Sequence, residues 1–285
     1  MIYINEKLFK NGDAKISVLD HGFLYGDALF ETMKSYGKKI FRLDSHLKRL
    51  FNSLHIIKIK PPLNKEELKE AIYVTLKASR ISDAYIRVTI SRGKGDTGID
   101  PSSCRKPNVI IITKKYHPVF HKSYKAIILD QRKNSHSILH RIKSANFLEN
   151  ILAKIAVREK GVDEGFFFNE EQFLAEGIIS NIFVLNKDKI LTPDLGCGIL
   201  PGITREAVIE LALNMRLNVE ETKIKKDALF KAEEIFITNS LLEVMPVVRV
   251  NDISIGDEKA GRITREIQKA YKELVKKETG NRNIA

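Results

Sequence analysis

The sequence predicts a two-domain protein of mixed α+β and α/β class. At 285 residues the chain exceeds the roughly 100–200 residues of an ordinary single domain. Strand-like and helix-like segments alternate along it, and a polar stretch, HPVFHKSY, interrupts them at 117–124. We therefore expect a smaller α+β domain at 1–117, a linker at 118–123 and a larger domain at 124–285.

In the first domain, apolar and β-branched runs predict strands at 2–5, 84–93 and 107–116, and two strands within 30–43 that turn near Gly37. Asp44 is a good N-cap and predicts a helix that starts there. A second helix is expected from about Asn64, because apolar residues follow it at helical spacing.

In the second domain, a strand is expected near 126–129, followed by a helix from about Ser144 to Lys160. The segments EGFFF, SNIFVLNKDKILTP and EIFITN predict further strands. One helix should open at Gly202, and an amphipathic helix with Ile263, Ile267 and Leu274 aligned should close the domain.

Charge and composition exclude several classes of function. The net charge of +12 could attract nucleic acid, but the basic residues are mixed with acids, as in KEELKE, so we expect no nucleic-acid partner. No apolar run approaches the ~20 residues of a membrane span and no leader pattern opens the chain, so we expect a cytoplasmic protein without a membrane partner. Cys104 and Cys197 lack metal-ligand spacing, so we expect no metal.

Two segments could bind phosphate. In LPGITREAVIELA, Gly202 precedes a helix whose first N–H groups, those of Ile203 and Thr204, have no intrahelical acceptor. In TNSLLEV, Asn239 and Ser240 follow an apolar strand. Alone, these features also fit an ordinary helix cap and a polar turn. Arg49 could add a fork-shaped donor, or be a surface arginine.

Two further residues could carry chemistry. Lys143 precedes an amphipathic helix and is followed by small residues that would leave room around its amine, as a desolvated Schiff-base lysine requires. Position alone does not distinguish Lys143 from the other lysines. Glu176 precedes a glycine and a strand, where a carboxylate could pair with a pyridine nitrogen or lie in a surface turn.

Read together, these segments resemble the fold-type IV pyridoxal 5′-phosphate (PLP) enzymes, the class IV aminotransferases. Six ordered segments carry the resemblance: HGFLYGDALFET (21–32), HLKRL (46–50), IKSANFLENILA (142–153), AEGIISNIFVL (175–185), GILPGITRE (198–206) and AEEIFITNSLLEVMPV (232–247). The resemblance implies the fold-type IV fold, PLP as cofactor and a homodimer.

The resemblance also implies residue roles. Lys143 would form the Schiff base and Glu176 would pair with the pyridine nitrogen. The cofactor site would further include Arg49, Ser180, Asn181, Gly202, Ile203, Thr204, Asn239 and Ser240. Candidates for the substrate pocket are Tyr25, Phe30, Arg87 and Arg92, which could equally be core or strand-edge residues.

Three activities share this fold. D-amino-acid transaminases typically carry an Arg-x-His pair where this chain has KGDTGIDP, so that activity ranks third. Branched-chain transaminases usually have Gly-Thr-Ala where this chain has TNSLLEV. The segment TNSLLEV instead resembles 4-amino-4-deoxychorismate lyases, as do EGIISN with GILPGITR, and NFLEN after the lysine. Conversely, AYIRVTISRGKGDTGIDP resembles branched-chain transaminases. The expectation is the lyase, with an L-branched-chain transaminase as the alternative.

Overall fold

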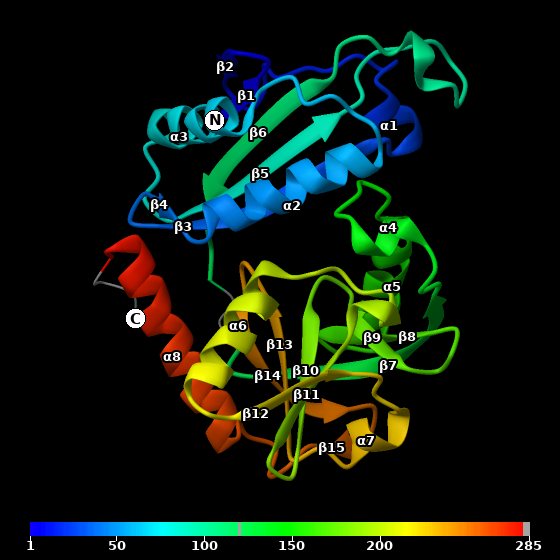
Figure 1. Cartoon of the computed structure of the whole chain (residues 1–285), viewed down its shortest axis with the longest axis vertical. Coiled ribbons are helices and arrows are strands. Elements are labelled where there is room, and N and C mark those ends of the chain that lie inside the picture. The colour runs from blue at the N-terminus through cyan, green and yellow to red at the C-terminus, as the bar shows by residue number, and fades with distance from the viewer. Residues whose placement is uncertain (119–120, 282–285) are drawn as a thin grey trace. The chain divides into compact units, whose positions relative to one another are not determined.

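A computed structural model describes residues 1–118 and 121–281 of the chain (Figure 1). The chain forms two units. Unit 1 comprises Met1–His117, Ile142–Asn146 and Val275–Ala285, and unit 2 comprises Pro118–Arg141 and Phe147–Leu274. The expected boundary after residue 117 coincides with a boundary between the units, but segments 142–146 and 275–285 fall in unit 1. Residues 119–120 of the expected linker, and residues 282–285, lie outside the described residues.

Unit 1 contains a sheet of six strands within the described residues, in the order β2-β1-β6-β5-β3-β4. All neighbouring strands are antiparallel. Their bounds are β1 Ile2–Ile4, β2 Lys7–Phe9, β3 Ala28–Tyr36, β4 Lys39–Ile40, β5 Ala84–Ser91 and β6 Asn108–Lys115. The strands β3 and β4 turn at Gly37, whose φ of 57° suits glycine.

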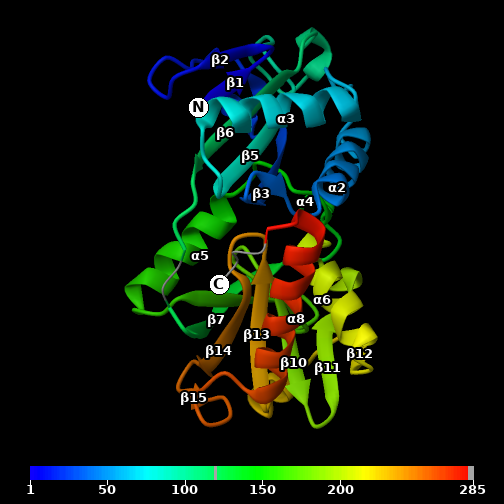
Figure 2. The same cartoon turned by 90° about the vertical axis from the view of Figure 1, so that its left-hand side faces the viewer.

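Two long helices, α2 (Leu43–Ile56) and α3 (Lys65–Ser79), cover one face of this sheet, as Figure 2 shows. Alternation along the strands places Met33 of β3 directly opposite Ile86 of β5 on that face, where both are fully buried against leucines of the helices. The other short elements of the unit are α1 (His21–Tyr25) and η1 (Pro101–Ser103). Residues with odd numbers in β3 therefore face the helices, and those with even numbers face away.

The sequence correctly predicts the N-cap residue of one of the two long helices and not that of the other. Asn64 caps α3 as expected, in a capping box with Glu67. The expected cap of α2 at Asp44 is wrong: the cap position is Arg42, and Asp44 lies inside the first turn, where its charge suits the helix dipole.

Unit 2 contains a larger sheet. Among the described residues it has nine strands, ordered β12-β11-β10-β13-β14-β7-β8-β9, with β15 beside β14. Its strands are β7 Tyr124–Lys133, β8 Glu164–Asn169, β9 Leu174–Gly177, β10 Asn181–Asn186, β11 Lys189–Pro193, β12 Asn218–Thr222, β13 Glu234–Asn239, β14 Glu243–Val250 and β15 Ile253–Ser254. The strands β8, β10 and β13 are almost wholly buried, as their apolar runs predict.

Helices and short turns complete unit 2: α4 Ile138–Arg141, α5 Leu148–Glu159, η2 Leu195–Cys197, α6 Ile203–Asn214, α7 Lys226–Phe230 and α8 Arg262–Thr279, whose residues from Val275 on belong to unit 1. The helix expected from Ser144 begins four residues later, at Leu148. The reason is that residues 143–145 exchange backbone hydrogen bonds with β3 of unit 1 instead of turning into a helix.

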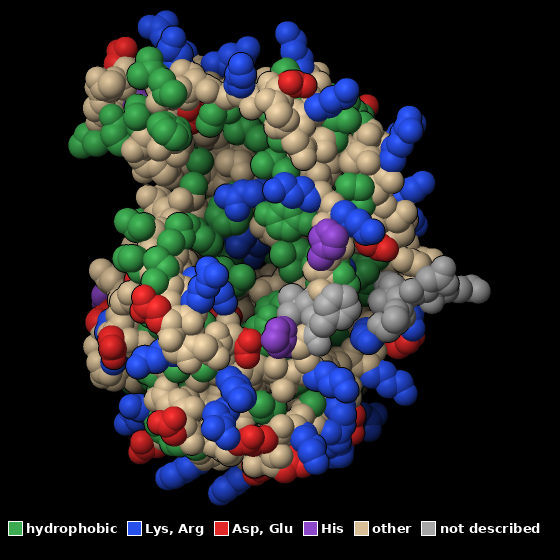
Figure 3. All heavy atoms as spheres, turned by 180° about the vertical axis from the view of Figure 1, so that it is seen from behind, with side chains coloured by type: hydrophobic (Ala, Val, Ile, Leu, Met, Phe, Trp, Pro, Cys, Tyr) green, Lys and Arg blue, Asp and Glu red, His purple; other side chains and the backbone are tan. Residues whose placement is uncertain are grey.

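None of the helices in the described part of the chain combines the length and apolar character that a membrane span requires. Lysine and arginine side chains are scattered over the face in Figure 3, many of them beside aspartate or glutamate. Surface ion pairs such as Lys223–Glu171 and Arg249–Glu258, both at 2.6 Å, belong to this pattern. Each is expected to contribute little to stability.

Candidate active site

Lys143 is held against strand β3 by its own backbone. The N–H of Phe30 donates to the carbonyl oxygen of Lys143 at 2.9 Å, and the N–H of Ala145 donates to that of Ala28 at 2.8 Å. The lysine side chain passes over the ring of Phe30, with Nζ 4.7 Å from the ring centroid. A sheet strand therefore fixes the backbone of Lys143, and an aromatic ring shields one side of its amine.

Phe30 and Arg87, two of the expected substrate residues, lie together on the sheet face that points away from α2 and α3. The strand register pairs Phe30 with Thr89 and Thr32 with Arg87. The guanidinium carbon of Arg87 lies 3.6 Å from the centroid of the Phe30 ring. Within unit 1, Lys143, Phe30 and Arg87 thus share one cluster, which is positively charged and aromatic.

Arg49 of α2 is fixed by a buried acid, Glu31 of β3. Its Nε and Nη2 each donate to a carboxylate oxygen of Glu31 at 2.7 Å, and Nδ1 of His46 lies 2.8 Å from Glu31 Oε2. Burial acts to raise the pKa of Glu31, but the charge of Arg49 and the hydrogen bonds from both partners outweigh it and lower the pKa to about 2. Burial lowers the pKa of His46, and the bond to Glu31 opposes this.

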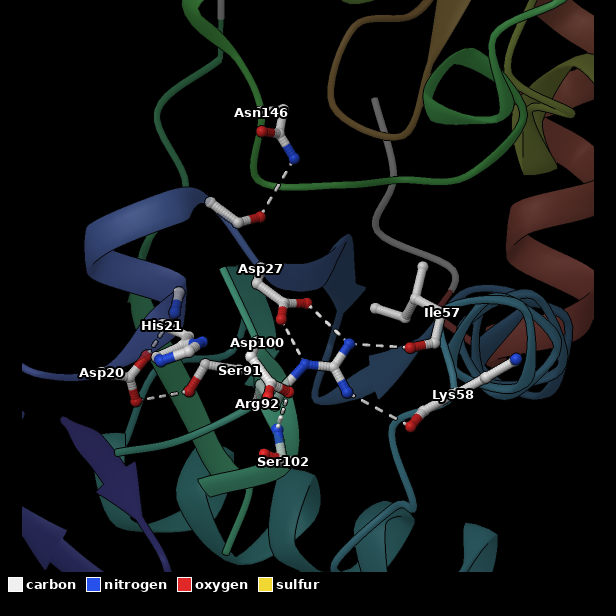
Figure 4. A network of polar contacts seen from close by, with 12 residues as sticks. Asp20, His21, Asp27, Ile57, Lys58, Ser91, Arg92, Asp100, Ser102 and Asn146 are labelled. Carbon is white, nitrogen blue, oxygen red and sulfur yellow. Dashed lines mark hydrogen bonds and ion pairs between the residues drawn. The ribbon is translucent and has the colours of Figure 1, made fainter. Parts of the chain in front are cut away.

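Tyr25 and Arg92 have structural partners. The Tyr25 hydroxyl accepts from the N–H of Gly98 at 2.6 Å. Arg92 pairs with Asp27 and donates Nη2 to the carbonyl oxygen of Ile57 at 2.8 Å, which ties the end of β5 to the residues after α2 (Figure 4). Their assignment to the substrate pocket stays a prediction, and for Arg92 the contacts favour a structural role.

Glu176 lies on the short buried strand β9 of unit 2, an element that the sequence did not predict. Oε1 accepts from Nζ of Lys133 at 2.5 Å. Oε2 accepts from the N–H of Leu200 at 3.0 Å and from Nδ2 of Asn181 at 3.3 Å. The carboxylate is therefore held in one orientation by three donors, as a group that must face a ring nitrogen requires.

Ser180, also expected in the cofactor site, supports the loop between β9 and β10. Its hydroxyl donates to Oε2 of Glu164 at 2.9 Å, and Oε1 of Glu164 accepts from the N–H of Ile178 at 3.0 Å. Burial raises the pKa of Glu164, which is enclosed completely. This serine thus orders the backbone next to Glu176.

The N-terminus of α6 lies beside Asn181. Gly202 is the cap residue and makes no side-chain capping bond, so the first N–H groups, those of Ile203 and Thr204, point out of the helix without a capping side chain. A Cβ atom on Gly202 would lie only 1.9 Å from Oδ1 of Asn181. Glycine is therefore required for the helix end to approach this close to the strand.

The turn after β13 completes the cluster in unit 2. Asn181 pairs with Thr238 across the sheet. Oδ1 of Asn239 accepts from the N–H groups of Leu241 and Leu242 at 2.9 and 2.8 Å, and its Nδ2 donates to the carbonyl oxygen of Ile179 at 3.3 Å. Unit 2 thus brings together the residues of this unit that the resemblance assigned to the cofactor, including the turn that carries Ser240.

The sequence reasoning missed four residues: Glu31, His46, Lys133 and Thr238. Glu31 could have been found from the sequence, because it is a charged residue within the otherwise apolar strand segment ALFETM. No local pattern singles out Lys133 among the lysines. Thr238 is buried, and its hydroxyl makes no hydrogen bond within the described residues, which marks a polar atom that a ligand could satisfy.

A model of the family described as amino-transferase class IV matches residues 28–250. The chain belongs to the class IV aminotransferase family. Members of this family use PLP, so the protein is a PLP-dependent enzyme, and the expected mixed α/β fold of the fold-type IV enzymes is confirmed.

This class IV enzyme is similar to relatives with two different names. It is 37% identical over 275 residues to a putative branched-chain-amino-acid aminotransferase of Methanocaldococcus jannaschii, with 96% of each chain covered. It is 36% identical to the aminodeoxychorismate lyase of Bacillus subtilis, with 97% of this chain and 95% of the relative covered. The branched-chain amino acid aminotransferase structure of Escherichia coli covers 99% of this chain and 96% of its own, at 28% identity and a TM-score of 0.93.

The residues present suit PLP chemically. A carboxylate fixed by three donors can pair with a protonated pyridine nitrogen, and an α-helix N-terminus beside an unsatisfied buried hydroxyl can receive a phosphate. The branched-chain transaminase and the lyase are both compatible with these findings, and which of the two reactions the enzyme catalyses is a separate question.

Proposed function

We propose that Lys143, Glu176, Arg49 and the two phosphate-binding segments act on one molecule of PLP. Lys143 would form the covalent bond to the cofactor, and Glu176 would pair with the pyridine nitrogen. The N–H groups of Ile203 and Thr204, the turn that carries Ser240, and Arg49 would hold the phosphate. Family membership and the fit of the donor set support this assignment.

Bound PLP supplies an electron-withdrawing ring that stabilises negative charge on the carbon bearing the substrate amine. The residues of the chain do the rest. Lys143 Nζ takes the proton from that carbon, and its backbone bonds to β3 keep the amine in a constant position. Glu176 keeps the ring nitrogen protonated. The phosphate donors anchor the cofactor so that proton transfer occurs within one complex.

We propose that the substrate is 4-amino-4-deoxychorismate and that the enzyme is a lyase. After Lys143 removes the proton, the bond to the enolpyruvyl oxygen breaks, pyruvate leaves, and the ring becomes the aromatic ring of p-aminobenzoate. The atoms of the substrate equal those of the two products, so no second substrate is needed.

The observation that carries this choice is the bond between Asn239 and the carbonyl oxygen of Ile179. It joins TNSLLEV and EGIISN, two of the segments on which the resemblance to the lyases rests. A glycine at position 239, as in the Gly-Thr-Ala segment usual in branched-chain transaminases, could form neither this bond nor the two bonds to Leu241 and Leu242. The match to the Bacillus subtilis lyase supports the same choice.

A branched-chain aminotransferase is the second candidate, because the segment 84–101 resembles those enzymes and because the Methanocaldococcus jannaschii relative bears that name. In that reaction Lys143 would again move the proton, and the amino group of the amino acid would pass to 2-oxoglutarate, which gives a 2-oxo acid and glutamate. A D-amino-acid transaminase ranks third, since the Arg-x-His pair is missing.

A paired assay tests the choice. The purified holoenzyme is incubated with 4-amino-4-deoxychorismate and assayed for pyruvate, and in parallel with L-leucine and 2-oxoglutarate and assayed for glutamate. We expect pyruvate without glutamate, and no product from Lys143→Ala in either tube. Glutamate without pyruvate would replace the lyase with the transaminase.

We also propose that the enzyme is a homodimer. On α5, the side chains of Leu148, Ile151, Leu152 and Ile155 follow helical spacing and are 68, 53, 48 and 49% exposed. A stripe of four large apolar residues on one helix is more than a single chain ordinarily leaves in water, and it is suited to a second copy of the chain.

A further inference from the structure

Lys133 is a buried lysine to which the proposed reaction assigns no role. It is the last residue of β7, and its side chain is 4% exposed. Nζ lies 2.5 Å from Oε1 of Glu176 and 5.0 Å from the centroid of the Phe167 ring. Removing an ammonium group from water costs several kcal/mol unless an opposite charge compensates it, so this pair must be kept intact for unit 2 to fold well.

The surroundings leave Lys133 as the positive charge that faces Glu176. Among the described residues, it is the basic side chain within ion-pair distance of that carboxylate. Burial, followed by the charge of Lys133, lowers the pKa of the neighbouring His140 to about 4, so this histidine is neutral near pH 7. The other donors to Glu176, Leu200 N–H and Asn181 Nδ2, are neutral and bind the other oxygen.

We propose that Lys133 is a positioning residue of the cofactor site, which pairs with Glu176 and holds its carboxylate in the orientation suited to the pyridine nitrogen of PLP. The inference rests on the proposed role of Glu176. Because Lys133 binds one carboxylate oxygen while Leu200 and Asn181 bind the other, its loss would free half of the carboxylate. It would also leave the buried carboxylate without its counter-charge, so the group that is proposed to face the ring nitrogen would be held less firmly.

The test is a double-mutant cycle on cofactor binding. Apoenzymes of the wild type, Lys133→Met, Glu176→Gln and the double variant are titrated with PLP, and the dissociation constant is read from the absorbance of the bound cofactor. We expect Lys133→Met to weaken binding about tenfold in the wild-type background and less than about twofold in the Glu176→Gln background, because the lysine acts through the carboxylate.

Two further variants complete the experiment. Lys133→Arg keeps the charge and is expected to restore most of the affinity, with the absorbance maximum of the wild type. Lys189→Met removes an exposed partner of Glu220, at 3.3 Å on β11, and should leave binding unchanged. If Lys133→Met folds poorly, the double variant, which leaves no unpaired charge, and Lys133→Arg still give a result.

Different outcomes would overturn the role of Lys133 and the proposed role of Glu176. Equal loss from Lys133→Met in both backgrounds, no loss in either, or no rescue by arginine would overturn the role of Lys133. A wild-type apoenzyme that does not bind PLP, or a Glu176→Gln variant that binds it like the wild type, would instead overturn the proposed role of Glu176.

Discussion

Glu31 carries its charge inside unit 1, on the sheet face that α2 covers. It is fully buried, and burial alone would favour the neutral acid, but Arg49 and His46 supply three hydrogen bonds and a positive charge. The net result is a carboxylate that remains ionised down to pH about 2. Glu31 affects function through Arg49. Because Nε and Nη2 of Arg49 donate to Glu31, the direction of the guanidinium is fixed.

The first prediction concerns Glu31→Gln. Loss of the carboxylate charge removes the anion that pairs with Arg49, so we expect the free energy of unfolding at pH 7 to fall by about 3 kcal/mol. The folded-state pKa of Glu31, about 2, lies below the usual 4.5, so its contribution is present above about pH 4.5 and is lost as the pH falls toward 2. The difference between wild type and variant should therefore shrink between pH 7 and pH 3.5, as measured by urea unfolding.

The matched control is Glu66→Gln, an exposed acid in the first turn of α3, for which a change within about 0.5 kcal/mol is expected. The affinity for PLP should fall in Glu31→Gln and not in the control, because Glu31 binds Nε and Nη2 of Arg49 and Glu66 lies on the surface of α3. Equal unfolding free energies of the two variants at pH 7 would show that the buried ion pair does not stabilise the fold.

At this scale the sequence predicts some residues and not others. Lys143 and Glu176 can be proposed from the sequence, because the six segments occur in the order typical of the class IV aminotransferases and each segment contributes a different part of the expected cofactor site. The sequence does not single out Lys133, since its importance depends on a side-chain contact with Glu176, which lies 43 positions further along the chain and two strands away in the sheet. The assignment of Arg92 to the substrate pocket stays a prediction, and its bonds to Asp27 and to the carbonyl oxygen of Ile57 tie two parts of unit 1 together.

At the scale of elements, strand alternation and helix ends position the functional groups. Alternation in β3 sends Glu31 toward the helices and Phe30 to the opposite face, where Lys143 lies. The helix α6 approaches β10 closely because residue 202 has no side chain. Periodicity predicted these elements, but it placed the start of α5 at Ser144, because it cannot detect that residues 143–145 bind the backbone of β3.

The second prediction concerns Gly202→Ala. The added Cβ would meet Oδ1 of Asn181 at 1.9 Å, which forces this amide away from Glu176 and from the carbonyl oxygen of Leu200. We expect PLP to bind at least about tenfold more weakly, a loss of about 1.4 kcal/mol, in an apoenzyme titration. Gly12→Ala, where a Cβ meets no atom within 4 Å, is the control. Unchanged affinity in Gly202→Ala would show that the close approach of α6 does not serve the cofactor.

At the scale of the whole molecule, both units contain residues of the proposed cofactor site. Lys143 and Arg49 belong to unit 1, while Glu176, Thr204 and Ser240 belong to unit 2. Length and the alternation of elements predicted two domains. They did not predict that segments 142–146 and 275–285 would join unit 1, because such returns of the chain are set by long-range contacts rather than by local sequence.

The third prediction concerns assembly. Replacing Ile151 by lysine places a charge in the middle of the exposed apolar stripe of α5, so we expect the dimer to dissociate, as measured by light scattering after gel filtration. Leu213→Lys, at an apolar residue of α6 that is 57% exposed, introduces the same side chain away from α5 and should leave the dimer intact. A wild-type protein that is monomeric at micromolar concentration would contradict the proposal.

The site of covalent attachment of PLP decides whether Lys143 has the role proposed for it. The holoenzyme is reduced with borohydride and digested, and the modified peptide is sequenced by mass spectrometry, with Lys143→Ala and Lys133→Met treated in parallel. We expect a single phosphopyridoxyl group on Lys143, no modified peptide from Lys143→Ala, and modification still on Lys143 in Lys133→Met. A label on another lysine of the wild type, or none, would contradict the account.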